Sequence, residues 1–334
     1  MQSNSSMPLK RFGKTDIQIS AIGLGGHHLG SAEAEHIAIE IVHRALDGGI
    51  SFFDCCWEYN RGKSEDWLGK GLKGQRDKAF LMTKVCTHGR DAALAMQMLE
   101  QSLRRLQTDH LDLWQIHGVS YPNDPDLFIR PGGAAEALTK AKKDGKVRFV
   151  GFSGHKDPDI HLAMLNTGFE FDAVQMPLNP FDANFHSFEQ KVLPVLNQRG
   201  IAPLAMKPIG GHGEPVTKGI FTADELLRYS MSLPVATTIT GVAEMAILEQ
   251  NLKIAQAFTP YSEAEMQALR MRAKPSAGDG RFELYKTSIK YDNPEARLAH
   301  NFPLDMQSVE VMQMVHATEN TGRPYPPVTG SPGA

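Results

Sequence analysis

The stretch Ile50-Ser-Phe-Phe-Asp-Cys-Cys-Trp-Glu-Tyr59 gives the first indication of the fold. Its apolar start is followed by polar residues and then by a glycine-containing loop over residues 60–64. An apolar run bounded in this way is typical of a buried β-strand. Asp54 is therefore predicted at the C-terminal end of a strand and Tyr59 in the loop that follows, which is where an α/β barrel carries its functional residues.

The same unit, an apolar strand followed by an amphipathic helix, recurs along the chain. The predicted strands lie near residues 20–24, 51–54, 80–84, 111–117, 147–153, 171–177, 201–207 and 235–240. The predicted helices lie near residues 33–48, 64–73, 91–106, 132–144, 157–166, 188–199, 222–232 and 244–257. Eight such units in about 240 residues favour an α/β fold of the (β/α)8 TIM-barrel type over a doubly wound sheet, which has fewer strands.

The two ends of the chain depart from this repeat. Residues 9–12 and 17–20 alternate around a glycine-led loop, so an N-terminal β-hairpin is expected. We expect a barrel over residues 8–257, a helical extension packed on it over 258–320, and a Pro/Gly-rich tail over 321–334. A capping-box pattern at residues 262–265 opens a helix in the extension. Two placements of the extension agree with the sequence: over the mouth of the barrel, or against its side.

Composition narrows the class of partner. A net charge of −3 and a pI near 6.5 give no electrostatic reason to expect nucleic acid or an anionic membrane surface. A small molecule is the expected partner. The chain shows neither a basic leader nor an apolar segment of about 18 residues, so a cytoplasmic location is expected.

Three cysteines, Cys55, Cys56 and Cys86, fit neither a disulfide framework nor a CxxC-type metal or cluster site. Cys55 and Cys56 are expected to be buried structural thiols that point to opposite faces of their strand, because adjacent strand residues do so. We assign them no chemical role from the sequence.

Six of the predicted strands end in polar side chains: Asp54, Lys84, His117, Ser153, Gln175 and Lys207. Together with Tyr59, the first three are the groups needed to reduce a carbonyl by hydride transfer. A phenol has a pKa near 10 and donates a proton weakly, so a cation is needed beside it, and Lys84 is expected to lower the pKa of Tyr59. Asp54 would keep Lys84 charged and in place, and His117 would hydrogen bond to the carbonyl oxygen.

These motifs resemble those of the aldo-keto reductase family. The matching stretches are Ala21-Ile-Gly-Leu-Gly-Gly26, Asp54-Cys-Cys-Trp-Glu-Tyr59, Lys63-Ser-Glu-Asp-Trp-Leu-Gly69, Leu81-Met-Thr-Lys84, Leu111-Asp-Leu-Trp-Gln-Ile-His117, Lys146-Val-Arg-Phe-Val-Gly-Phe-Ser-Gly-His155, Val174-Gln-Met-Pro-Leu-Asn179, Ile239-Thr-Gly241 and Glu249-Gln-Asn-Leu252. The resemblance implies an oxidoreductase that transfers a hydride between a nicotinamide cofactor, NADP or NAD, and the carbonyl or alcohol of a small aldehyde, ketone or sugar. It implies a catalytic tetrad of Asp54, Tyr59, Lys84 and His117, and neither a metal nor an iron–sulfur cluster.

The resemblance also implies a set of cofactor-binding positions. They are Gly25, Gly26, Asp54, Ser153, His155, Gln175, Met206, Lys207, Pro208, Gly210, Gly241, Glu244, Gln250 and Asn251. Ser153 and Gln175 match positions that hold the nicotinamide carboxamide, but Gly154 replaces the usual asparagine, and His155 is expected to compensate. Met206 stands where many members stack a tyrosine on the ring. Glu244 stands where members carry a cation for the 2′-phosphate of NADP, which makes NAD an alternative to the usual NADP.

Two other functions agree with parts of the sequence. Histidines at or after strand ends, His27, His28, His117, His155 and His212, would suit a metal-dependent hydrolase on the same barrel. The chain lacks the HxH pair after the first strand and the aspartate ending the eighth that such an enzyme needs. A non-catalytic, cofactor-binding barrel is the second alternative, and the presence of all four tetrad residues argues against it.

Overall fold

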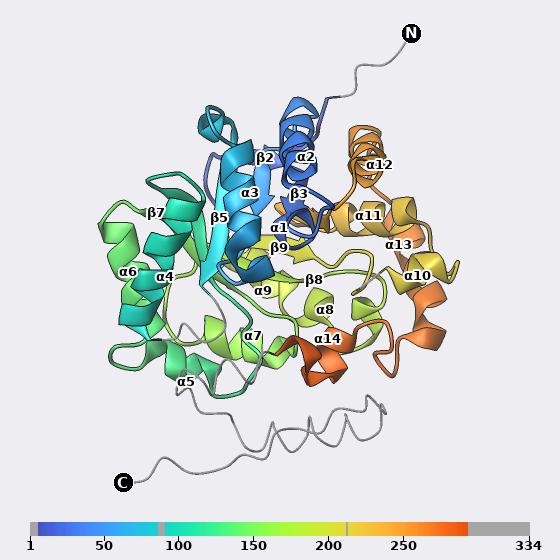
Figure 1. The fold of residues 1–334 in the computed structure, drawn as a ribbon. Coiled ribbons are helices and arrows are strands. Elements are labelled where there is room, and N and C mark those ends of the chain that lie inside the picture. Colours follow the sequence, from blue (N-terminus) through green and yellow to red (C-terminus); the bar gives the residue numbers. More distant parts are fainter. Residues whose placement is uncertain (1–5, 86–90, 212, 293–334) are drawn as a thin grey trace.

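A computed structural model describes residues 6–85, 91–211 and 213–292. Within them, eight parallel strands form a closed barrel surrounded by helices (Figure 1). The barrel strands are β3 (Ile22–Gly25), β4 (Phe52–Asp54), β5 (Phe80–Val85), β6 (Leu111–Ile116), β7 (Val147–Ser153), β8 (Ala173–Pro177), β9 (Ala202–Met206) and β10 (Thr237–Gly241). The last strand, β10, pairs with the first, β3, from Thr238 opposite Ile22 to Gly241 opposite Gly25. The predicted TIM barrel is confirmed.

Helices join successive strands and cover the outside of the barrel. They are α2 (Glu35–Asp47), α3 (Lys63–Gly71), α4 (Ala92–Arg105), α6 (Ala134–Lys143), α7 (Pro158–Leu165), α8 (Phe188–Lys191), α9 (Leu193–Arg199), α11 (Ala223–Ser232) and α12 (Met245–Gln256). The single helix predicted near residues 188–199 is in fact two. Pro194 lies in the first turn of α9 and cannot continue the hydrogen bonding of a preceding helix, so the chain breaks at Val192.

Three short helices lie in loops whose residues show no helical periodicity. They are α1 (Gly26–Leu29), α5 (Asp124–Ile129) and α10 (Glu214–Thr217). Helices of four to six residues are too short to show a repeating apolar face, so periodicity does not detect them.

The predicted N-terminal hairpin is confirmed and closes one end of the barrel. Strands β1 (Leu9–Arg11) and β2 (Gln18–Ser20) pair antiparallel. Phe12, in the turn between them, places its ring 4.9 Å from that of Phe80 and 5.0 Å from that of Phe149, measured between ring centroids. These aromatic side chains fill the N-terminal end of the barrel, so the opposite end, where the strands finish, is left for ligands.

The first part of the C-terminal extension, as far as residue 292, lies over the loops that follow β7, β8 and β9. It contains α13 (Glu263–Ala273), which begins at the predicted capping box of Ser262 and Glu265, and α14 (Leu284–Thr287), drawn in orange to red in Figure 1. His155, Asn179 and Lys207 all contact Tyr285 of this segment. Of the two placements considered, the extension adopts the one over the mouth; the predicted tail and the rest of the extension lie outside the described residues.

In the described part of the chain, no helix combines the length and apolarity needed to cross a lipid bilayer.

Candidate active site

A buried ion pair lies at the centre of the barrel mouth. Lys84, near the end of β5, is 1% exposed, and its ammonium group donates to the Asp54 carboxylate at the end of β4. The same ammonium donates to the carbonyl of Cys55 at 2.9 Å and lies 3.5 Å from the Tyr59 hydroxyl. The amide nitrogen of Gln175 donates to the second oxygen of Asp54 at 3.0 Å. Both carboxylate oxygens of Asp54 are therefore paired, which is what a buried charge requires.

A tight turn with left-handed backbone conformations follows Tyr59 and fixes the position of its side chain. Tyr59–Gly62 forms a short 3₁₀ turn in which two non-glycine residues, Asn60 (φ 50°) and Arg61 (φ 57°), adopt left-handed conformations. Such conformations persist only where surrounding contacts enforce them. Here the Asn60 amide donates to the His27 carbonyl at 2.7 Å and to the Ser64 hydroxyl at 3.0 Å. The turn is thus tied to the loop after β3, and Tyr59 is held at the mouth.

Two histidine rings flank the phenol of Tyr59. The ring centroid of His27 lies 5.2 Å from that of Tyr59, and the ring centroid of His117 lies 5.5 Å away, both with their planes nearly perpendicular to the phenol. His117 follows directly after β6, as predicted. Tyr59, Lys84, Asp54 and His117 therefore form one contiguous cluster, built from the ends of β4, β5 and β6.

The pKa of Tyr59 differs from the expectation. Burial raises the pKa of Tyr59 well above its usual value, and the negative charge of Asp54 adds to the rise. The expected lowering of the pKa of Tyr59 is therefore wrong for the net value: burial and Asp54 outweigh the effect of the Lys84 ammonium. The Asp54 carboxylate sits against the same ammonium and offsets its charge, while burial disfavours the phenolate. Tyr59 therefore keeps its proton throughout the neutral range, as a proton donor must.

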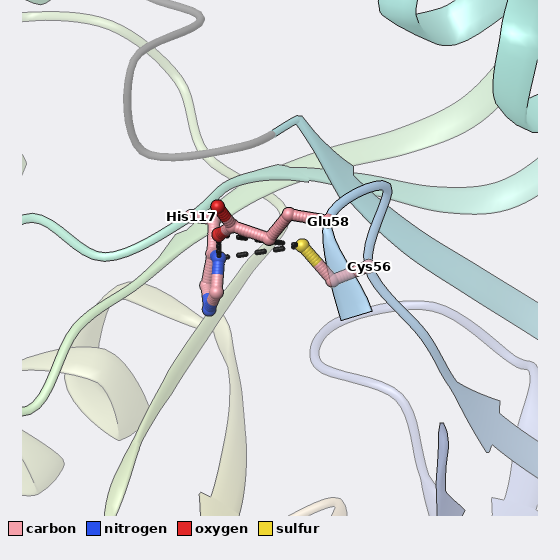
Figure 2. A group of neighbouring side chains, drawn as sticks. All are labelled: Cys56, Glu58 and His117. Atoms are coloured by element: carbon pink, nitrogen blue, oxygen red, sulfur yellow. Dashed lines mark hydrogen bonds and ion pairs between the residues drawn. The ribbon is translucent and has the colours of Figure 1, made fainter. Parts of the chain in front are cut away.

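The imidazole of His117 is held by residues that the sequence did not indicate. Its Nδ1 atom hydrogen bonds to the Glu58 carboxylate and lies 3.3 Å from Cys56 Sγ (Figure 2). The prediction that Cys55 and Cys56 are buried is confirmed, but Cys56 is in contact with a tetrad residue. Glu58, Cys56 and His27 could not be found from spacing, because each meets its partner across the ends of different strands.

The nicotinamide carboxamide needs an acceptor and a donor near the tetrad, and the residues at β7 and β8 fit. The Gln175 side-chain oxygen is buried and has no hydrogen-bond partner among the described residues, so it can accept a hydrogen bond from a ligand. Gln175 lies in the middle of β8 rather than at its end as predicted, because pairing with β9 continues to Pro177. Ser153, the last residue of β7, is opposite Gln175 in the sheet.

His155 is buried, and its Nδ1 atom lies 3.1 Å from the carbonyl oxygen of Tyr285, which can only accept. Burial, followed by the nearby charge of Lys207, holds the pKa of His155 well below its usual value. The neutral ring thus carries its proton on Nδ1 and presents Nε2 as an acceptor. The imidazole can accept a hydrogen bond but not donate a second one.

Lys207 is a second cation at the mouth. It follows β9 with a left-handed backbone (φ 54°), and its ammonium lies 5.0 Å from the centre of the Tyr285 ring and 5.4 Å from that of Tyr291. Burial, with a smaller contribution from Lys84, lowers the pKa of Lys207 to about 8. No carboxylate pairs with this ammonium among the described residues. Lys207 can therefore bind an anion.

The remaining predicted cofactor residues separate into two sets. Gly25, Gly26, Met206, Pro208 and Gly210 lie beside the tetrad at the ends of β3 and β9. A Cβ atom on Gly26 would lie 2.6 Å from the carbonyl oxygen of Asp54, so only glycine fits there. Gly241, Glu244, Gln250 and Asn251 lie at β10 and α12.

In the set at β10 and α12, Glu244 and Gln250 are exposed, whereas Asn251 is buried. The Asn251 amide donates to the Thr240 hydroxyl at 3.2 Å. This contact joins the helix to the last barrel strand and leaves the amide oxygen of Asn251 for another donor.

Comparison with known proteins shows which family the sequence matches. The sequence profile of the aldo/keto reductase family matches residues 21–214. A 6-dehydroglucose reductase of Novosphingobium aromaticivorans is 30% identical over 228 residues, which are 62% of this chain and 72% of that protein. The oxidoreductase YqkF of Bacillus subtilis is 25% identical over 312 residues, 80% of this chain and 97% of that protein.

Solved structures agree in fold. An aldo/keto reductase of Klebsiella pneumoniae, crystallised with NADP and acetate, superimposes with a TM-score of 0.65 at 25% identity, over 81% of this chain and 97% of that one. The holo form of an aldo-keto reductase of Bacillus halodurans gives a TM-score of 0.67 at 23% identity, over 83% of this chain and all of that one.

Proposed function

The chain belongs to the aldo/keto reductase family and is an NAD(P)-dependent oxidoreductase, and we propose that it reduces a small-molecule carbonyl with Tyr59 as the proton donor. The observation that carries this proposal is the contact between Lys84 and three groups at once: the Asp54 carboxylate, the Cys55 carbonyl and the Tyr59 hydroxyl. This arrangement aims a protonated phenol at the mouth with a fixed cation beside it.

When bound, the reduced nicotinamide supplies the hydride. The phenol of Tyr59 then gives its proton to the carbonyl oxygen, and the ammonium of Lys84, 3.5 Å from the phenol oxygen, stabilises the phenolate that remains. Asp54 holds Lys84 in place through its paired carboxylate. His117, which is held through Nδ1 by Glu58, lies beside the Tyr59 phenol and positions the substrate carbonyl.

We assign the cofactor-binding roles by the same reasoning. Ser153, Gln175 and His155 hold the carboxamide, because the Gln175 oxygen and the His155 Nε2 atom are both acceptors suited to its amino group. Met206 covers the ring, and Lys207 with Gly210 meets the negatively charged phosphates. Gly241, Glu244, Gln250 and Asn251 lie against the adenosine end.

The substrate class proposed is an aldehyde, ketone or sugar. One relative is named a 6-dehydroglucose reductase, and another, 33% identical over 160 residues, is named an L-galactose dehydrogenase of Arabidopsis thaliana, which makes sugars the first group to test.

The test is a panel of sugars, aldehydes and ketones assayed with NADH and with NADPH, following the loss of the reduced nicotinamide. We expect at least one carbonyl to be reduced at a rate proportional to enzyme concentration. Cofactor binding is measured in parallel by fluorescence titration. A folded protein that binds the reduced cofactor but turns over no carbonyl would favour the non-catalytic barrel instead.

A further inference from the structure

Three side chains of different chemistry converge beside the tetrad (Figure 2). Cys56 and Glu58 lie in the loop after β4, and His117 follows β6. Cys56 Sγ is 3.3 Å from His117 Nδ1 and 3.9 Å from Glu58 Oε1, and the last two atoms are in hydrogen-bond contact. Each residue thus turns one metal-binding atom toward the same point.

The spacing of these atoms matches the edges of a tetrahedral zinc site. Zinc binds cysteine sulfur at about 2.3 Å and histidine nitrogen or carboxylate oxygen at about 2.0–2.2 Å, so the sulfur of a tetrahedral site lies about 3.6 Å from each of the other two ligands. The observed sulfur distances of 3.3 and 3.9 Å lie on either side of this value. Only Glu58 and His117 must separate, and the Glu58 side chain, on a loop, can rotate to do so.

The exposure of the three residues indicates an open site rather than a closed structural one. Cys56 is fully buried, while the side chains of Glu58 and His117 are 19% and 18% exposed. The thiol therefore lies beneath and the other two ligands face the mouth. Three protein ligands with one position left for water or a small ligand is the arrangement of reactive, not structural, zinc sites.

The donor set selects the kind of metal. A thiolate excludes Mg²⁺ and Ca²⁺, which prefer all-oxygen ligands, and the combination of sulfur, imidazole nitrogen and carboxylate suits Zn²⁺. We propose that Cys56, Glu58 and His117 form a binding site for a divalent zinc ion at the mouth of the barrel. This site differs from that of the metal-dependent hydrolase considered from the sequence, which requires an HxH pair after the first strand.

Binding changes the protons at the site in a defined way. The thiol of Cys56 releases its proton to solvent as the metal–sulfur bond forms, because the thiolate is the ligand. The metal takes the lone pair of Nδ1, so the proton of the neutral His117 ring resides on Nε2. The Glu58 carboxylate exchanges its hydrogen bond with His117 for a bond to the metal. No oxidant or reductant takes part.

The test uses Co²⁺ as a spectroscopic substitute for Zn²⁺, added to the full-length protein after chelator treatment. Because His117 also belongs to the proposed tetrad, metal binding is measured by absorption and not by turnover. We expect one equivalent of Co²⁺ to give the charge-transfer band of a cobalt–thiolate bond and the visible bands of a tetrahedral ion, and one equivalent of Zn²⁺ to displace it.

Variants assign the ligands. Cys56→Ala should remove the charge-transfer band, and Glu58→Gln should lower the affinity at least about tenfold, since loss even of groups that only support a metal ligand costs that much. Cys55→Ala is the matched control: Cys55 also follows β4, but its sulfur packs against Gly26, and the band should persist.

Absence of a thiolate band, or its survival in Cys56→Ala, would overturn the proposal. If Cys56→Ala does not fold, the titration of Glu58→Gln decides: unchanged affinity would count equally against the site. Failure of the carbonyl panel would leave the cobalt result intact, so the two proposals are separable.

Discussion

Two buried lysine–carboxylate pairs lie at the mouth of this barrel, and they differ in what surrounds them. Lys84 pairs with Asp54, and Lys286 of the extension pairs with Asp182 at 2.6 Å; both lysine side chains are 1% exposed. The third partner of Lys84 is the Tyr59 phenol, whereas Lys286 also binds a second carboxylate, that of Glu283, at 3.1 Å. Burial and pairing are the same, so they do not distinguish a reactive site from a structural one.

The difference lies in the hydrogen-bonding capacity that remains. Asp182 also accepts from the backbone amides of Phe188 and Glu189, so its oxygens are fully used. Beside Asp54, the Gln175 oxygen is buried with no partner among the described residues. The Lys286–Asp182 pair therefore stabilises the fold, while the Lys84–Asp54 pair adjoins a group that a ligand can satisfy.

The largest effect is expected for Tyr59→Phe. Loss of the proton donor should lower turnover by roughly 10²–10⁴-fold, the usual contribution of general acid catalysis, with little change in cofactor affinity. Steady-state kinetics on the best substrate of the panel measures it. Tyr229→Phe is the control, since Tyr229 is also buried and has a raised pKa but binds Glu189, away from the mouth. A Tyr59→Phe enzyme with a tenth of the wild-type turnover would show that another group donates the proton.

Lys286→Met tests the structural pair. Removing one partner leaves the Asp182 and Glu283 charges buried together, and such changes lower the free energy of unfolding by about 3–5 kcal/mol. Urea unfolding measures the change, and turnover below the melting temperature should fall far less than in Tyr59→Phe. Lys290→Met, at an exposed lysine of the same segment, should shift stability by no more than about 0.5 kcal/mol. Equal stability of Lys286→Met and wild type would mean that this pair contributes nothing to the docking of the extension.

Lys207 extends the comparison to a half-buried lysine with no carboxylate partner among the described residues. Its pKa is lowered to about 8, so the ammonium is charged at neutral pH and loses its charge as the pH rises above 8. Affinity for the dinucleotide phosphates should therefore decrease between pH 7 and pH 9.5. At pH 7, Lys207→Met should weaken binding by about 10- to 150-fold, the value of a charge-assisted contact of 1.5–3 kcal/mol.

Fluorescence titration across this pH range measures the effect. In Lys207→Met the decrease with pH should disappear, because the titrating amine is gone. A wild-type affinity that is flat from pH 7 to pH 9.5 would place the phosphates away from Lys207.

The barrel and the clustering of Asp54, Lys84 and His117 were predictable because both depend on local sequence patterns. Each strand–helix unit has its own apolar period, and Asp54, Lys84 and His117 lie at or beside the ends of their strands. The parallel barrel then brings these strand ends together independently of the conformation of the loops. The break at Val192 was missed because the helical period over residues 188–199 does not show it; the break comes from a single proline, Pro194.

Contacts between loops were not predictable, because they join residues that are far apart in the sequence. Glu58 binds His117, and Tyr285 packs against Lys207, across 59 and 78 residues of sequence respectively, and no spacing rule links such positions. The pKa of Tyr59 was misjudged because the sequence identifies a neighbouring cation but not how Asp54 and burial offset it. Charge balance at a buried site depends on three-dimensional placement.

The smallest effect concerns the choice of dinucleotide, which we expect to depend on the carboxylate of Glu244. Glu244 is the N-cap residue that precedes α12, is exposed, and makes no capping hydrogen bond with its side chain. An acidic group here repels the 2′-phosphate of NADP and can accept from the free 2′-hydroxyl of NAD. Lys253 is exposed whereas Asn251 is buried, so the two point to different sides of the helix.

We therefore expect the wild-type protein to discriminate weakly between the two cofactors. In Glu244→Arg, the affinity for NADPH should rise about tenfold, which corresponds to the lower end of the free-energy range of a charge-assisted contact. Arg44, on the neighbouring helix α2, is a competing cation, but it is engaged by Glu249 through two contacts of 2.6 and 2.9 Å. Glu249→Gln is the matched control: it removes a negative charge on the same helix and releases Arg44. If this control raises NADPH affinity as much as Glu244→Arg does, then Arg44 reaches the phosphate. A wild-type preference for NADPH above about a hundredfold, beyond what one partly screened contact provides, would show that a cation elsewhere in the chain binds the 2′-phosphate and that Glu244 does not set the choice.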